Sequence, residues 1–206
     1  MIRSKSSARW LKEHHGDAYV REARQAGYRS RAAFKLAHIQ KADQLLRPGM
    51  TVVDLGAAPG GWSQVAVEQV GTSGRVVAFD LLDIEPIAGV EFVRGDFSEA
   101  SGLDRLNAML KGSEVDLVLS DMAPNMSGIR EVDQARAMSL SELCLDFVRA
   151  ACRPGSALLM KVFEGAGLSE FRMDLKRSFT RVETRKPEAS RARSRELYLL
   201  ARNYTV

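Results

Sequence analysis

The chain has 206 residues, of which 45% are hydrophobic and 27% are charged, as is ordinary for a soluble globular protein. This length is enough for one domain with a sizeable core. No apolar run approaches the ~20 residues of a membrane-spanning helix, and the basic N-terminus lacks the apolar stretch of a secretory signal, so we expect a cytoplasmic protein that has no membrane partner.

The net charge of +4 is unevenly distributed along the chain. Residues 1–35 carry a net +6, residues 36–171 a net −8 and residues 172–202 a net +6. A basic patch is typical of a protein whose partner is rich in phosphate. Two separate solvated faces would explain the same charges, and the charges alone do not decide between these explanations.

Helical periodicity runs through residues 14–46. Six positions in this stretch are predicted to face a core: Phe34, Leu36, His38, Ile39, Leu45 and Leu46. The Arg-Pro-Gly sequence at 47–49 ends the helical pattern. We therefore expect one domain over residues 1–206, with a basic helical extension at about 1–47.

Short apolar strands then alternate with helices. Strands are predicted at 51–55, 75–80, 90–96, 115–121 and 156–165, and a final strand pair at 181–187 and 195–202. Helices are predicted at 61–70, 103–112, 133–155 and 169–179, with Ser169 as the N-cap of the last. This alternation predicts an α/β fold: a Rossmann-like, doubly wound, mainly parallel seven-stranded sheet with helices on both faces.

Glycines separate the first strand from its helix, in VVDLGAAPGGW (52–62). Gly56, Gly60 and Gly61 allow the backbone to turn tightly and to approach a ligand closely. Asp54 is placed to accept hydrogen bonds from turn amides or from a ligand amine. The spacing differs from the G-x-G-x-x-G of dinucleotide-binding enzymes, and a structural tight turn would also explain the glycines.

Charged side chains are predicted at or near the carboxyl ends of four strands, where ligands of such sheets bind: Asp80, Asp96, Asp121 and Lys161. Asp80 follows Gly56 at the spacing usual for a ribose-hydroxyl ligand, and Asp96 is placed to accept from an adenine amino group. Each aspartate by itself is equally well explained as a helix cap or turn former. Together along one edge they indicate a ligand that contains a nucleoside.

Lys161 interrupts a strand that is apolar on both faces, SALLMKVFEG (156–165). An ammonium group is rarely buried without a partner, so this position indicates a function for the amine. The alternative is a strand-end lysine whose ammonium group extends into water.

Seven motifs that span nearly the whole chain narrow these possibilities: YRSRAAFKL (28–36), GMTVVDLGAAPGGWSQ (49–64), FD (79–80), GDF (95–97), SDMAPNMSG (120–128), KVFEG (161–165) and RKPEASRARSRELY (185–198). Together they resemble the FtsJ/RrmJ (RlmE) family of S-adenosylmethionine-dependent 2′-O-methyltransferases of ribosomal RNA. The compact length is similar to that of the bacterial branch. The resemblance implies that the substrate is a uridine in the A-loop of 23S rRNA, within the assembled 50S subunit.

The resemblance also implies which residues act. The catalytic set would be Lys35, Asp121, Lys161 and Glu196. The contacts to S-adenosylmethionine would be Gly60, Trp62, Asp80, Asp96 and Asp121, with Asp54, Gly56 and Phe97 as further candidates. Arginines that precede Lys35 or flank Glu196 are candidate RNA contacts: Arg29, Arg31, Arg191, Arg193 and Arg195.

A ribose hydroxyl is a weak nucleophile, so the enzyme must align it with the methyl group and remove its proton. Our hypothesis is that Lys161 accepts this proton, oriented by Asp121 and Glu196, while Lys35 supports the site. Lys161 must then be neutral; Lys35 favours the neutral amine, whereas the two carboxylates favour the charged one. No metal is required, and neither the three histidines nor Cys144 and Cys152 show metal-ligand spacing.

Three other functions stay open. A nicotinamide dehydrogenase shares the alternation but lacks the G-x-G-x-x-G motif. A methyltransferase of a small molecule or a protein would leave the basic ends unused. A non-catalytic ribosome-assembly factor would bind RNA without needing Lys161 and Glu196. A monomer with two reduced cysteines is the expected state of the chain.

Overall fold

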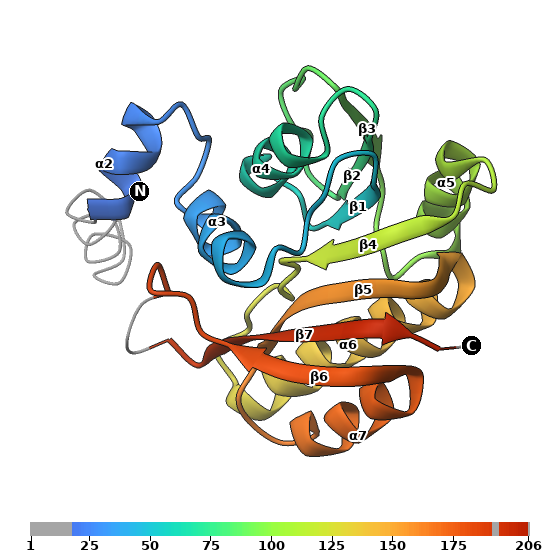
Figure 1. The fold of residues 1–206 in the computed structure, drawn as a ribbon. Helices are drawn as coiled ribbons and strands as arrows, with labels where there is room; N and C mark the ends of the chain where they lie inside the picture. The colour runs from blue at the N-terminus through green and yellow to red at the C-terminus, as the bar shows by residue number, and fades with distance from the viewer. Residues whose placement is uncertain (1–17, 191–193, 206) are drawn as a thin grey trace.

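Seven strands form one sheet in the computed structural model, which describes residues 18–190 and 194–205 (Figure 1). The strands are β1 (Thr51–Leu55), β2 (Arg75–Asp80), β3 (Val90–Arg94), β4 (Val115–Ser120), β5 (Cys152–Phe163), β6 (Phe179–Arg185) and β7 (Glu196–Tyr204). Their order is β3-β2-β1-β4-β5-β7-β6. The first five strands are parallel, and β7 lies antiparallel between β5 and β6. The predicted α/β, mainly parallel seven-stranded fold is therefore confirmed.

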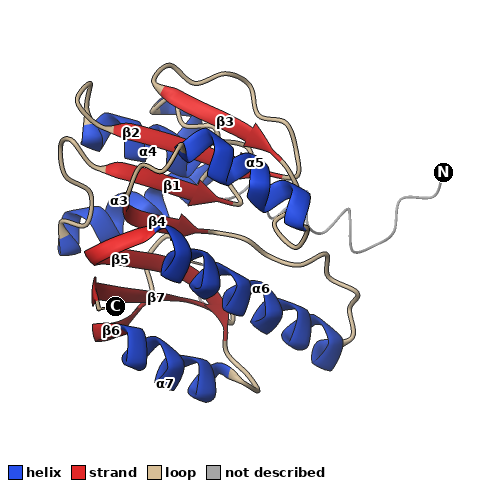
Figure 2. Ribbon diagram, turned by 90° about the vertical axis from the view of Figure 1, so that its right-hand side faces the viewer, coloured by secondary structure: helices blue, strands red, loops and turns tan. Residues whose placement is uncertain are grey.

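Helices cover both faces of the sheet, as Figure 2 shows. The helices of the described chain are α2 (Ala18–Gln25), α3 (Ala32–Asp43), α4 (Gly61–Val70), α5 (Ala100–Leu110), α6 (Arg130–Ala151) and α7 (Leu168–Ser178). Helices α3 and α4 lie on one face, and α5, α6 and α7 lie on the other. No helix in the described ranges is long and apolar enough to span a bilayer.

Strand β5 contributes to both cores because its side chains alternate between the faces. Leu158, Met160 and Val162 belong to the core beneath α5, α6 and α7. Leu159 belongs to the core beneath α3 and α4, together with Tyr198 of β7. Lys161 is the next residue of β5 on the same face as Leu159, and it lies at the edge of the core beneath α3 and α4.

The topology places a crevice at the carboxyl ends of β1 and β4. Strand β1 pairs with β2 on one side and with β4 on the other. The chain therefore leaves β1 toward β2 on one side and later returns to form β4 on the other side of β1. Ligands of doubly wound sheets bind at such a reversal of strand order.

The N-terminal region differs from the single helix that its periodicity predicts. Helices α2 and α3 are separated by residues 26–31, where Gly27 adopts a φ of +78°. Among the six predicted core positions, Phe34 and His38 are only partly buried, while Leu36 and the other three are buried. Periodicity does not report the break, because both helices carry buried side chains: Val20 and Ala23 on α2, and Leu36 among those on α3.

Several helix boundaries also differ from those predicted. Helix α6 ends at Ala151, and the Pro-Gly sequence lies within β5, where the pairing of β4 and β5 shifts register. Gly167, at a φ of +84°, is the N-cap of α7, so Ser169 lies inside that helix. Helix α5 begins three residues earlier than predicted, at Ala100. The predictions from Ser169 and from the Pro-Gly sequence were wrong. The packing of the folded chain sets the backbone geometry, and this geometry decides where a helix begins or ends.

Candidate active site

A cavity of about 620 Å³ opens at the carboxyl edge of the sheet. Its volume is within the range of ligand pockets, roughly 300–1,000 Å³. Loops after β1, β2, β3 and β4 and one side of α6 line it. Five of the predicted site residues contribute to this lining: Gly56, Asp80, Asp96, Phe97 and Asp121.

The glycine turn brings two backbones together at this cavity. Gly56 has a φ of +76°, and a Cβ atom there would lie 2.8 Å from the backbone nitrogen of Met122. A side chain at position 56 would therefore separate the loops after β1 and β4. The sequence indicated a close backbone approach at Gly56, but it did not reveal that Met122 is the opposing residue.

The carboxylates of Asp80 and Asp96 are held by hydrogen bonds at the cavity wall. Asp80 Oδ2 accepts from the backbone amide of Ala58 and Oδ1 from that of Leu82, both over 2.8 Å. Asp96 Oδ1 accepts from the hydroxyl and the amide of Ser98, and these bonds hold the pKa of Asp96 below its usual value. Two fixed acceptors at separate points of the wall fit a ligand that presents hydroxyl and amino groups.

Asp54 lies beneath the turn and is fully buried. Its Oδ2 accepts from the hydroxyl of Ser63 over 2.6 Å, and its Oδ1 has no hydrogen-bond partner in the described part of the chain. Burial, supplemented by the negative charges of Asp121 and Asp80, raises the pKa of Asp54 to about 7. Asp54, Gly60 and Trp62 do not belong to the cavity lining, so their assignment to a cofactor stays a prediction.

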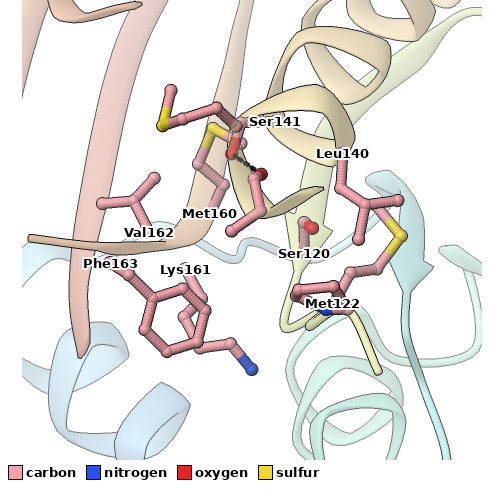
Figure 3. Close-up of a pocket in the computed structure, with 11 residues that line it drawn as sticks. Ser120, Met122, Leu140, Ser141, Met160, Lys161, Val162 and Phe163 are labelled. Atoms are coloured by element: carbon pink, nitrogen blue, oxygen red, sulfur yellow. Dashed lines mark hydrogen bonds between the residues drawn. The ribbon is translucent and has the colours of Figure 1, made fainter. Parts of the chain in front are cut away.

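Lys161 meets Asp121 where β4 and β5 end side by side. Its Nζ donates to the backbone oxygen of Asp121 over 2.6 Å and lies 3.1 Å from Asp121 Oδ1. The side chain of Lys161 is only 7% exposed. Figure 3 shows that Lys161 and Phe163 extend from β5 to the side opposite Met160 and Val162. The amine thus has the partner that its burial requires.

Lys35 and Glu196 form a second ion pair, between α3 and the start of β7. The distance between Lys35 Nζ and Glu196 Oε2 is 3.1 Å, and the two side chains are 11% and 26% exposed. Burial alone would raise the pKa of Glu196, but the positive charges of Lys35 and Lys161 outweigh it and hold this pKa below its usual value. Two lysines and two carboxylates from four elements therefore act on one another.

Tyr198 joins the two pairs, and the sequence analysis did not identify it. It pairs with Lys161 across β5 and β7. Its hydroxyl donates to Asp121 Oδ1 over 3.0 Å, and its ring lies 5.6 Å from Lys35 Nζ and 5.6 Å from the ring of Trp62. Burial, and then the negative charges of Asp121 and Glu196, raise the pKa of Tyr198, so its hydroxyl stays a donor. The sequence did carry one signal for Tyr198. It lies two residues after Glu196 in the predicted last strand, so strand alternation places both side chains on the same face of the sheet.

Three of the arginines predicted to contact RNA have partners within the chain. Arg29 donates to the backbone oxygens of Pro59, Glu85 and Pro86. Arg31 donates to the backbone oxygen of Ala189, and Arg195 to that of Glu164. Arg191 and Arg193 lie outside the described residues. RNA contacts by these five arginines therefore stay predictions.

The cysteines are free thiols, Cys144 on α6 and Cys152 at the start of β5. Burial raises the pKa of each to about 12, which makes them unreactive. Within the described ranges, no group of three or more His, Cys, Asp and Glu side chains is placed to hold a metal ion.

Comparison with known proteins identifies the family. The sequence model of the FtsJ-like methyltransferases matches residues 28–204. A ribosomal RNA large subunit methyltransferase E from Alkalilimnicola ehrlichii is 60% identical over 98% of this chain and 97% of its own. The protein of that name from Chromohalobacter salexigens is 56% identical over 98% and 96%.

A solved structure supports the same assignment. It is described as a ribosomal RNA methyltransferase from Plasmodium falciparum, and it superposes with a TM-score of 0.78 at 27% identity, over 86% of this chain and 98% of its own. The resemblance drawn from the motifs is confirmed: the chain belongs to the FtsJ-like methyltransferase family.

Proposed function

We propose that this enzyme transfers a methyl group from S-adenosylmethionine to the 2′-hydroxyl of a uridine ribose in the A-loop of 23S rRNA, within the assembled 50S subunit. The observation that carries the proposal is the meeting of Lys161, Asp121, Lys35 and Glu196 beside the cavity, where Asp121 is also part of the lining. The names of the similar bacterial proteins support large-subunit rRNA as the substrate.

The cavity fits S-adenosylmethionine in size and chemistry. Asp80 would accept from the ribose hydroxyls and Asp96 from the adenine amino group, since both carboxylates are fixed at the cavity wall. The Asp54 oxygen that has no hydrogen-bond partner among the described residues would suit an amine reached through the glycine turn. When bound, the cofactor supplies a methyl group that is already activated by a positively charged sulfur.

Residues of this chain would accept the proton of the ribose hydroxyl. As the methyl carbon passed from the sulfur to the ribose oxygen, the sulfur would leave as a neutral thioether and the hydroxyl proton would pass to Lys161 Nζ. Asp121 holds this amine by its side chain and its backbone oxygen, which fixes the direction of the lone pair and stabilises the ammonium that forms.

The test is Lys161→Met, assayed with labelled S-adenosylmethionine and 50S particles that lack the modification. We expect turnover to fall by about 10³-fold or more, because general-base catalysis typically contributes 10²–10⁴-fold. The affinity for S-adenosylmethionine, measured by calorimetry, should stay within about threefold, since no wall contact is removed. Turnover near that of the wild type would refute the assignment of Lys161.

Locating the label decides the reaction. A methyl group on a ribose of the particle supports the proposal, and label on a base or a protein contradicts it. Binding of the particle without transfer would indicate an assembly factor. Free 23S rRNA, tested in parallel, should be a poorer substrate than the particle if assembly is required.

The basic ends of the chain would hold the RNA. We expect binding that weakens steeply with salt, because each neutralised phosphate releases counterions. The double variant Arg191→Ala, Arg193→Ala should bind more weakly and show a shallower salt dependence. An unchanged salt dependence would contradict a role for these two arginines.

A further inference from the structure

We propose that Arg29 is a positioning residue that joins the two walls of the cofactor cavity, rather than a ligand of RNA phosphate. The inference rests on the proposed S-adenosylmethionine site. Arg29 lies in the connection between α2 and α3, outside the cavity lining. Its role would therefore be exerted through the segments that it contacts.

Those contacts join two segments that are distant in sequence. The guanidinium donates from Nη1 to the backbone oxygens of Pro59 and Glu85, and from Nη2 to that of Pro86 over 2.8 Å. Pro59 belongs to the glycine turn after β1, whereas Glu85 and Pro86 belong to the loop between β2 and β3. One planar group thus holds the turn against the loop.

The same two segments are joined a second time on the cavity side. Asp80 accepts from the amide of Ala58 in the turn and from the amide of Leu82 in the loop. Ala58, Asp80 and Leu82 all line the cavity. Arg29 from outside and Asp80 from inside therefore fix the distance between these two walls.

The backbone of Arg29 is itself anchored. Its amide donates to Gln64 Oε1 over 2.9 Å, and Gln64 Nε2 donates to the backbone oxygen of Gly27 over 3.0 Å. Gln64 belongs to α4, which follows the turn directly. The side chain also fills its space closely, since a Cβ at Gly60 would lie 3.3 Å from Arg29 Nη1 and 2.6 Å from Ile87 Cδ1.

Three of the five N–H donors of Arg29 already serve backbone oxygens. A phosphate ligand would have only the remaining two donors, unless these backbone contacts were given up. The planar guanidinium group can donate to several acceptors at once, whereas the ammonium group of a lysine is a point charge that does not span them. Lysine retains the charge that a phosphate contact needs, so Arg29→Lys separates the two roles.

The experiment measures the affinity for S-adenosylmethionine by calorimetry and the affinity for 50S particles by filter binding, for Arg29→Ala and Arg29→Lys. We expect both variants to bind S-adenosylmethionine about tenfold or more weakly, as loss of several hydrogen bonds implies. Affinity for the particle and kcat at saturating S-adenosylmethionine should stay near wild type. Arg105→Ala, which removes an exposed arginine of α5 that donates to the backbone oxygen of Arg94 and lies outside both basic ends, is the matched control and should change neither affinity.

A second measurement does not depend on the cofactor. Hydrogen exchange in the absence of S-adenosylmethionine should be faster at 56–61 and 81–89 in Arg29→Lys than in the wild type. If Arg29→Ala does not fold, Arg29→Lys and Arg29→Gln provide both measurements. Failure of the wild type to bind S-adenosylmethionine would refute the proposed function, while the exchange data would still decide the role of Arg29.

Three results would overturn the inference. They are unchanged S-adenosylmethionine affinity in Arg29→Ala, full recovery of that affinity in Arg29→Lys, and unchanged exchange at 56–61 and 81–89. Weakened particle binding with normal cofactor binding would instead assign Arg29 to RNA.

Discussion

The hydroxyl of Tyr198 donates a 3.0 Å hydrogen bond to Asp121 Oδ1, the same oxygen that lies 3.1 Å from Lys161 Nζ. The carboxylate is thus held between a neutral donor and an amine. Because Tyr198 pairs with Lys161 across the sheet, the backbone of β5 and β7 sets this geometry. The position of Asp121 therefore depends on both strands, and its ability to orient Lys161 depends on Tyr198.

Tyr198→Phe removes only the hydroxyl from this arrangement. We expect kcat to fall about fivefold, since a net hydrogen bond is worth roughly 1 kcal/mol, with little change in KM for S-adenosylmethionine. Tyr204→Phe, at the other end of β7, is the control and should leave kcat unchanged. Equal effects of the two variants would show that Tyr198 acts only by packing.

The Lys35–Glu196 pair should be energetically coupled. Lys35→Met and Glu196→Gln each leave a partly buried charge without its partner, so the double variant should be more stable than the sum of the single effects, by about 1–3 kcal/mol. The exposed pair of Arg94 and Asp83 is the control and should show no measurable coupling. Additive unfolding free energies at Lys35 and Glu196 would contradict this prediction.

The same pair has a defined pH dependence. The folded-state pKa of Glu196 is lowered, so the stabilisation is complete above the unfolded pKa of about 4.3 and is lost as the pH falls through the folded value. The coupling measured at pH 7 should therefore persist to about pH 5 and decline below about pH 4. Urea unfolding of the four variants across this range is the measurement.

Asp54 should have the opposite pH dependence. Its pKa is raised to about 7 in the folded state, so the folded chain holds a proton that the unfolded chain has released, and stability falls as the pH rises from about 4 to 7. Asp54→Asn removes this term and keeps an acceptor for Ser63. Relative to the wild type, the variant should gain unfolding free energy between pH 5 and pH 8, at up to ~1.4 kcal/mol per pH unit. A constant difference across this range would contradict the prediction.

Gly56→Ala tests the close approach of the loops after β1 and β4. The added methyl would meet the Met122 backbone, so we expect it to cost about 2 kcal/mol or more beyond backbone strain and to weaken binding of S-adenosylmethionine. Gly112→Ala is a matched control, because Gly112 has nearly the same φ, +74°, and open space around it. Thermal unfolding and calorimetry of both variants give the comparison, and equal losses would mean that strain alone acts at Gly56.

Local patterns predicted the elements closest to the site. The strands over 51–55 and 75–80 and the helix over 61–70 agree with the structure residue for residue. Each is a short apolar segment next to a glycine, so hydrophobic periodicity and the neighbouring glycine indicate the same boundary for the element. The N-terminal region was predicted less well, because the helical periodicity continues across Gly27, where the structure separates α2 from α3.

The sequence by itself determined the alternation of strands and helices, the place of Lys161 within an apolar strand and the aspartates at strand ends, because these depend on neighbours within a few residues. The resemblance of its motifs also indicated the family. Only the tertiary structure decided which groups meet: Lys35 with Glu196, 161 positions away, Tyr198 with Asp121, and Arg29 with backbone oxygens of two loops. Such contacts follow from strand order and register, and a backbone oxygen has no signature in the sequence. The partners of these charged side chains are therefore known only from the tertiary structure.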